Sequence, residues 1–208
     1  MNISVNSMML GVVGTNCYIV SNDDTKEAVI IDPGDEAGKV NDFLKKNGLA
    51  PKAVLLTHGH FDHIMGVNGV RDAWQVPVYV SEPEKVLMED PSLNGCGMIG
   101  RSVSVRADKF LKDNEKVTLG GMLFDVIYTP GHTGGGVCYY MPQTELLFSG
   151  DTLFQGSVGR TDLPTGSMST LVRSIKERLV NLPENTKVLP GHGPSSTIGE
   201  EKKYNPYL

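Results

Sequence analysis

Three histidines and an aspartate lie within six consecutive positions of this chain. Residues 58–63 read HGHFDH, and the other two of the five histidines, His132 and His192, each follow a glycine. Neutral imidazole is the commonest protein ligand for metal ions, and carboxylates often complete such sites. A single histidine is more often an ordinary core or surface group, but this spacing predicts a metal centre.

Short apolar runs precede each of these histidine segments and one further aspartate. Such runs, rich in branched or aromatic residues and closed by Gly or Pro, are typical of buried strands. A rigid sheet can hold the loops at its strand ends so that their side chains converge on one site. The runs cover residues 53–57, 124–129, 146–150 and 187–191, and they lead to His58, His132, Asp151 and His192.

Composition narrows the class of protein. With 208 residues and 39% hydrophobic content, residues 1–208 are expected to form one domain with a sizeable core. The net charge of −5 and the scattered Lys and Arg residues disfavour a nucleic-acid partner. No basic segment precedes an apolar N-terminus, and no apolar run approaches the roughly 20 residues that span a bilayer. We therefore expect a cytoplasmic protein without a membrane partner.

Strand and helix signals alternate along the chain. Branched runs and turn residues predict strands, and apolar residues at helical spacing predict helices. The expected strands cover 2–10, 16–22, 27–32, 76–80, 116–119, 122–129, 136–141 and 145–149. The expected helices lie around Val40 to Leu44 and over 63–74, 83–89 and 167–182, and a Gly-rich loop covers 91–106. Strands paired into two sheets with helices outside predict an α/β fold, a four-layer αββα sandwich.

These motifs resemble the metallo-β-lactamase superfamily over nearly the whole chain. The matching segments, in order, are 58–63, 131–132, 149–151 and 190–193. Segments 129–133 and 149–154 are most similar to the glyoxalase II (hydroxyacylglutathione hydrolase) branch, in its small bacterial form without a C-terminal helical domain. Zinc β-lactamases often have a metal-binding Cys where this chain has Asp151, which disfavours β-lactam hydrolysis.

The resemblance implies a dinuclear site. One metal would bind His58, His60 and His132, the second would bind Asp62, His63 and His192, and Asp151 would bridge them. Seven nitrogen and oxygen ligands exceed what one tetrahedral zinc accepts. We expect two divalent ions, zinc by preference, with iron or manganese as alternatives. A metal-bridging hydroxide would hydrolyse a small-molecule thioester or related acyl ester, with Asp62 and Asp151 as catalytic residues.

The loop after Asp151 departs from typical glyoxalase II enzymes. Those enzymes have a Lys and a Tyr that hold glutathione, whereas this chain has Arg160 and Asp162. We expect Arg160 to bind substrate, with a surface salt bridge to Asp162 as the alternative. The Gly-Arg-Thr-Asp segment at 159–162 also resembles persulfide dioxygenases, so a mononuclear iron dioxygenase is the main rival to a hydrolase. A non-catalytic binding protein is a third, weaker hypothesis, and the sequence predicts no oligomeric state.

Overall fold

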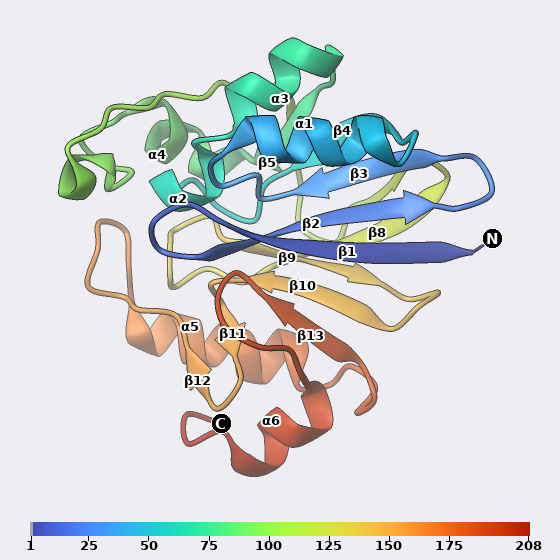
Figure 1. The fold of residues 1–208 in the computed structure, drawn as a ribbon. Helices are drawn as coiled ribbons and strands as arrows, with labels where there is room; N and C mark the ends of the chain where they lie inside the picture. Colours follow the sequence, from blue (N-terminus) through green and yellow to red (C-terminus); the bar gives the residue numbers. More distant parts are fainter. Residues whose placement is uncertain (1) are drawn as a thin grey trace.

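Two mixed sheets carry most of the strands in this computed structural model, which describes residues 2–208 (Figure 1). The first sheet has the order β1-β2-β3-β4-β5-β6. Its strands are β1 Ile3–Leu10, β2 Thr15–Asn22, β3 Glu27–Ile31, β4 Ala50–Leu55, β5 Val78–Ser81 and β6 Lys109–Leu111. The second sheet has the order β14-β13-β10-β9-β8-β7. Its strands are β7 Lys116–Leu119, β8 Met122–Tyr128, β9 Val137–Met141, β10 Leu146–Gly150, β13 Lys187–Pro190 and β14 Ser196–Thr197.

Helices cover the outer face of each sheet (Figure 1). The helices α1 Ala37–Lys46 and α3 Val67–Trp74 pack on the first sheet, where Val40 and Val70 belong to one buried cluster with Ile30. The helix α5 Met168–Ser174 continues into a π-helical turn, Ile175–Leu179, and packs on the second sheet. No helix within residues 2–208 is both long enough and apolar enough to cross a bilayer.

Besides the apolar clusters under the helices, another apolar cluster fills the space between the two sheets. It contains Tyr18 and Leu55 from the first sheet and Phe124, Tyr139 and Phe148 from the second. Each sheet therefore buries both faces, one against the other sheet and one against helices. The predicted four-layer αββα sandwich is confirmed.

Strand direction brings the expected site residues to one edge of the sandwich. β10 is parallel to β13, and β8 and β10 are both antiparallel to β9, so β8, β10 and β13 end at the same edge. β4 ends there too, because the Val137 N–H donates to the Thr57 carbonyl (2.9 Å) and the Tyr139 hydroxyl donates to the Leu56 carbonyl (2.7 Å). The prediction that four strands deliver residues to one site is confirmed.

The helix expected over 63–74 is in fact two helices, α2 Phe61–Ile64 and α3. The Gly66 N–H donates to the Pro33 carbonyl at 2.9 Å, and a Cβ at this position would lie 2.6 Å from that oxygen. Only glycine permits this approach, and the contact interrupts the helix.

Several short elements were not predicted from the sequence. They are β6, β14, the two-stranded ribbon of β11 Leu153–Phe154 and β12 Ser157–Val158, and the helix α6 Ile198–Tyr204. The shorter helix α4 Lys85–Glu89 agrees with the prediction for 83–89 after a 3₁₀ turn at Glu82–Glu84. The loop 91–106 contains one 3₁₀ turn, Cys96–Ile99.

Candidate metal centre

All seven residues expected to bind metal converge at the edge where β4, β8, β10 and β13 end. Their potential ligand atoms form three overlapping groups, and within each group these atoms lie no more than 4.8 Å apart. The groups are His58, His60 and His132, then His58, His63 and Asp151, and finally Asp62, His63 and His192. The structure therefore places every one of the predicted ligands in a single cluster.

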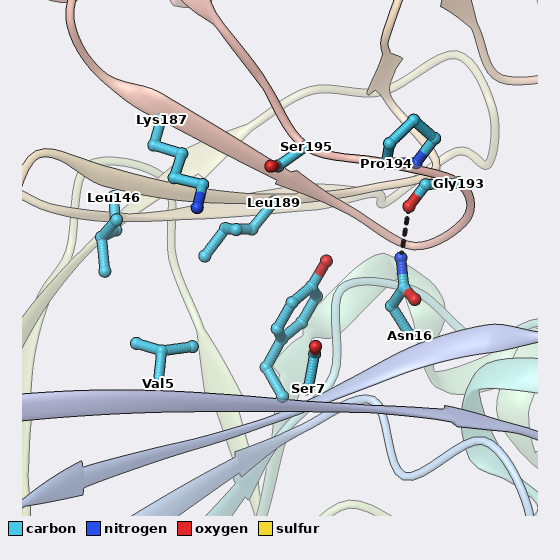
Figure 2. A pocket seen from close by; sticks show the side chains of 10 residues that line it. Val5, Ser7, Asn16, Leu146, Lys187, Leu189, Gly193, Pro194 and Ser195 are labelled. Atoms are coloured by element: carbon cyan, nitrogen blue, oxygen red, sulfur yellow. Dashed lines mark hydrogen bonds between the residues drawn. The ribbon is translucent and has the colours of Figure 1, made fainter.

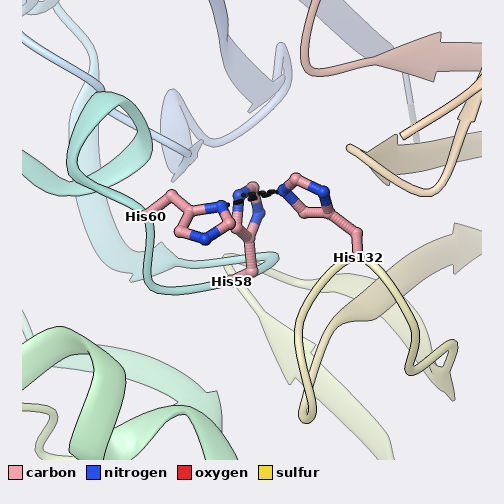
Figure 3. A group of neighbouring side chains, drawn as sticks. All are labelled: His58, His60 and His132. Carbon is pink, nitrogen blue, oxygen red and sulfur yellow. Dashed lines mark hydrogen bonds between the residues drawn. The ribbon is translucent and has the colours of Figure 1, made fainter. Parts of the chain in front are cut away.

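Three imidazole nitrogens face one another in the first group (Figure 3). His132 Nε2 lies 2.9 Å from His60 Nδ1 and 3.2 Å from His58 Nε2. His132 Nδ1 lies 2.7 Å from the Arg160 carbonyl oxygen, which can only accept a hydrogen bond. His132 must therefore carry its proton on Nδ1, and its Nε2 turns a lone pair toward the other two rings.

The His58 tautomer follows from its neighbour. The Thr57 hydroxyl donates its one proton to Asp32 at 2.6 Å, so it can only accept from His58 Nδ1, which lies 3.1 Å away. His58 Nε2 is then also a bare lone pair, 3.2 Å from that of His132. Two lone pairs at this distance repel each other unless a cation lies between them. The first group therefore fits a metal ion.

His63 has the same arrangement in the second group. Its Nδ1 lies 2.9 Å from an Asp32 carboxylate oxygen, which fixes the proton there. Its Nε2 is buried and has no hydrogen-bond partner among residues 2–208, as is also true of Asp151 Oδ1, 3.4 Å away. His192 Nε2 lies 3.0 Å from Asp62 Oδ2. A cation shared by His63 Nε2 and Asp151 Oδ1 would satisfy two groups that residues 2–208 leave unpaired.

Burial and neighbouring charges favour the metal-binding forms of four of these residues, His58, His60, Asp62 and Asp151. Burial and the nearby histidines lower the pKa of His58, and burial and His132 lower the pKa of His60 to about 3, so both rings are neutral at pH 7. Burial opposes ionisation of Asp62 and Asp151, but the charge of His63 holds the pKa of each carboxyl below its usual value. Burial also opposes the charged form of His63, yet the carboxylates around it, Asp151 first, raise its pKa, so a metal ion that binds Nε2 must displace a proton there. The same negative charges attract a divalent cation.

A further buried carboxylate, Glu84, joins the loops that carry the first histidine group. Only 1% of Glu84 is exposed. One of its oxygens accepts from the Gly59 N–H (2.8 Å), and the other accepts from the Gly135 N–H (2.7 Å). Sequence reasoning missed this residue, because nothing in the run Glu82-Pro83-Glu84 distinguishes the buried glutamate from the exposed one.

We expect Glu84→Gln to weaken metal binding by about tenfold to a hundredfold, the usual range for groups that orient metal ligands. The amide offers one acceptor oxygen to two N–H donors, so one of the two loops loses its hydrogen bond. Chelator competition on the purified protein measures this change, with Glu82→Gln as the matched exposed control. Equal metal affinity in Glu84→Gln and wild type would contradict the positioning role.

The turn before His192 is fastened to the first sheet (Figure 2). Asn16 Nδ2 donates to the carbonyls of Pro190 (3.0 Å) and Gly193 (2.9 Å), and the Tyr18 hydroxyl donates to Pro190 (2.7 Å). A cavity of about 290 Å³ lies beside these contacts, and none of the seven expected ligands is among its lining residues in the described chain. Asn16 and Tyr18, which line this cavity, therefore fix the position of the loop that carries His192.

A larger pocket of about 480 Å³ lies directly over the cluster. His60, Asp62, His132, Asp151 and His192 all contribute to its lining. Their coordinating groups are therefore accessible to a small molecule. A cluster of potential metal ligands at the base of an open pocket is the arrangement of a catalytic site rather than of a closed structural metal site.

Arg160 also lines this pocket, at its exposed margin. Its Nε and Nη2 donate to the two carboxylate oxygens of Asp162, both at 2.7 Å, and its side chain is 56% exposed. The salt bridge with Asp162, the alternative to a substrate role for Arg160, is therefore present. The backbone of Arg160 also contributes to the site, because its carbonyl oxygen accepts a hydrogen bond from His132 Nδ1 and orients that ring.

Comparison with known proteins identifies the family. The model of the metallo-beta-lactamase superfamily matches residues 10–192. YqgX of Bacillus subtilis (strain 168), a probable metallo-hydrolase, is 44% identical over 203 residues, which cover 97% of this chain and 95% of that protein. The hydroxyacylglutathione hydrolase GloC of Haemophilus influenzae is 36% identical over 196 residues, which cover 93% of this chain and 92% of GloC.

Solved structures agree over nearly the full length. BLEG-1, described as a B3 metallo-beta-lactamase, has a TM-score of 0.95 and 46% identity, with 99% of each chain covered. TTHA1623 in a di-iron-bound form has a TM-score of 0.89 and 38% identity, covering 98% of this chain and 100% of that one. ETHE1 from Myxococcus xanthus has a TM-score of 0.79 and 29% identity, covering 98% and 83%. The chain belongs to the metallo-beta-lactamase superfamily.

Proposed function

We propose that this protein is a metal-dependent hydrolase that cleaves a thioester, in the manner of glyoxalase II. The observation that carries the proposal is the cluster of five histidines and two aspartates at the base of an open pocket. The relatives support it, since one is a probable metallo-hydrolase and another is a hydroxyacylglutathione hydrolase. The pocket lining within residues 2–208 contains no serine or cysteine, so the proposed nucleophile is water.

His58, His60 and His132 would hold one ion, and Asp62, His63 and His192 would hold the other, with Asp151 between them. Two divalent cations held there would lower the pKa of a water molecule between them to about 7 and polarise the acyl carbonyl. The water oxygen bonds to the acyl carbon, the C–S bond breaks, and the products are a carboxylic acid and a thiol. The Thr15 hydroxyl donates to Asp62 Oδ2 at 3.0 Å and holds this oxygen beside His192 Nε2, 3.0 Å away, so the carboxylate is fixed in the site where it would orient the water.

Two other activities have specific support. A mononuclear iron persulfide dioxygenase, using two histidines and Asp151 as a facial triad, follows from the Gly-Arg-Thr-Asp loop at 159–162. β-Lactam hydrolysis follows from the likeness to BLEG-1, which is described as a B3 metallo-beta-lactamase. We place both below thioester hydrolysis, because seven ligands exceed the needs of one iron and because Asp151 stands where zinc β-lactamases often have Cys.

One assay panel separates the three activities. The purified protein, with its metal content measured, is tested against S-D-lactoylglutathione and other thioesters, against a cephalosporin, and for oxygen consumption with a persulfide. We expect thioester cleavage without oxygen uptake. Persulfide-dependent oxygen uptake by an iron-loaded protein that leaves thioesters intact would overturn the proposal in favour of the dioxygenase.

Arg160 remains a proposed substrate contact, and its pairing with Asp162 defines how to test it. A substrate carboxylate must displace Asp162 from the guanidinium. With S-D-lactoylglutathione we therefore expect Arg160→Ala to raise KM by about threefold, the modest effect of an exposed ion pair, with little change in kcat. Asp162→Asn should lower KM, because it frees the guanidinium. Unchanged kinetics in both variants would mean that Arg160 forms only a surface salt bridge and does not contact the substrate.

A further inference from the structure

The pocket above the metal centre is walled by apolar side chains. Two of them are unusually exposed for their size, Met98 at 58% and Val13 at 48%. Apolar side chains that gather around one pocket, rather than lying singly on the surface, mark a binding site. The apolar lining residues are Val13, Phe61, Met98, Ile99, Phe154 and Leu163.

Met98 and Ile99 come from the loop 91–106, whose role the sequence did not reveal. Asn94 holds this loop in place, because its Nδ2 donates to the Val103 carbonyl (2.9 Å) and its Oδ1 accepts from the Cys96 N–H (3.1 Å). The Asn94 carbonyl accepts from the Phe61 N–H (2.8 Å), which joins the loop to α2. The loop is therefore a fixed wall beside the expected metal ligands.

The polar groups of the lining, apart from the expected metal ligands, are already satisfied. The side-chain nitrogen and oxygen of Asn94 both form hydrogen bonds within the loop 91–106. Arg160 is compensated by Asp162 through two hydrogen bonds. Among the described residues, the walls thus present no uncompensated charge to a bound molecule.

We propose that the substrate of this site presents an uncharged, apolar chain to the walls of the pocket. The inference rests on the proposed thioester hydrolase function and narrows its substrate class. Glutathione has two carboxylates, and Arg160, the one cationic side chain among the described lining residues, is already paired with Asp162, so a carboxylate binds there only by displacing Asp162. An apolar chain, in contrast, gains free energy for every methylene that it removes from water. The apolar chain of the substrate can be part of the acyl group or of the thiol, since both are attached to the reacting carbonyl carbon.

Two substrate series test the proposal and distinguish these sources. In one series, straight acyl chains of two to eight carbons are joined to the small neutral thiol N-acetylcysteamine. In the other, an acetyl group is joined to straight alkyl thiols of increasing length. We expect kcat/KM to rise by about two- to fourfold per methylene in the series whose chain contacts the walls, until the pocket is filled. Values independent of length in both series would overturn the proposal.

Met98 provides the matched variant. Met98→Gln keeps the length of the side chain but makes the wall polar, so the dependence on chain length should flatten. Metal content should stay at the wild-type level, because Met98 is not one of the clustered ligands. Val86→Gln changes an equally exposed apolar residue, 63% exposed, that is not among the lining residues, and it should leave the dependence intact. A chain-length dependence that Met98→Gln leaves unchanged would count against the apolar wall.

Binding without turnover separates this inference from the proposed function. Non-hydrolysable thioethers, one with an octyl chain and one with glutathione, are titrated into the metal-loaded protein by calorimetry. We expect the octyl thioether to bind more tightly, with the negative heat-capacity change of apolar burial. Failure to cleave any thioester would refute the hydrolase proposal alone, whereas preferential binding of the glutathione thioether would refute the apolar substrate class alone.

Discussion

Replacing Asp151 by Asn should lower turnover by at least about a hundredfold while the protein remains folded. Asp151 lies 3.4 Å from His63 Nε2 and 3.6 Å from both His132 and His192, so it touches both groups of proposed ligands. Asparagine keeps the shape of the side chain but removes the negative charge that offsets two cations. It can also turn an N–H₂ group toward the site, which repels metal.

Steady-state assays against the preferred thioester measure this effect, and thermal unfolding establishes that the variant is folded. Asp72→Asn, on the exposed surface of α3, makes the same chemical change away from the site and should leave turnover at the wild-type level. Near-normal turnover in a folded, metal-loaded Asp151→Asn protein would refute the bridging role.

The sequence predicted the layers and the clustering of the candidate metal ligands because each depends on local signals. The mainly apolar runs that lead to His58, His132, Asp151 and His192 are short and local, and a strand covers most of each run in the structure. Strand direction then brings the four residues together, which needs only the usual rules of sheet topology. No histidine lies outside the cluster, so no choice among histidines was needed.

The features that were missed depend on contacts between distant segments. Glu84 is separated from Gly59 by 25 residues and from Gly135 by 51, and no local pattern reports either hydrogen bond. The break between α2 and α3 likewise arises from the contact of Gly66 with Pro33. In both cases tertiary contacts decided the local structure.

The helix α6 could have been predicted. Thr197 and Glu200 form a capping box, in which the Thr197 hydroxyl accepts from the Glu200 N–H and the Glu200 carboxylate accepts from the Thr197 N–H. This Thr-x-x-Glu pattern is visible in the sequence and marks a helix start. The helical periodicity that follows this signal is weak, because the segment is short and polar and Ile198 is its only fully buried apolar residue.

Metal stoichiometry should separate the two halves of the site. We expect the wild-type protein, purified with ample metal, to hold close to two ions, because its seven nitrogen and oxygen ligands exceed one tetrahedral shell. His132→Ala removes a ligand whose Nε2 faces His58 and His60, so it should empty the first position. His63→Ala removes the unpaired Nε2 beside Asp62 and Asp151, so it should empty the second.

Elemental analysis after gel filtration measures the bound metal, and each variant should retain close to one ion. Asp72→Asn serves again as the control and should retain both. The two histidine variants should also differ from each other, because the position left in His132→Ala includes the two carboxylates, whereas the position left in His63→Ala rests mainly on neutral imidazoles. His132→Ala should therefore hold its ion more tightly against a chelator, since a divalent cation gains more from anionic oxygens than from neutral nitrogens at the same depth. A wild-type protein that stays at one ion through saturating zinc, iron and manganese would refute the dinuclear site and strengthen the mononuclear dioxygenase.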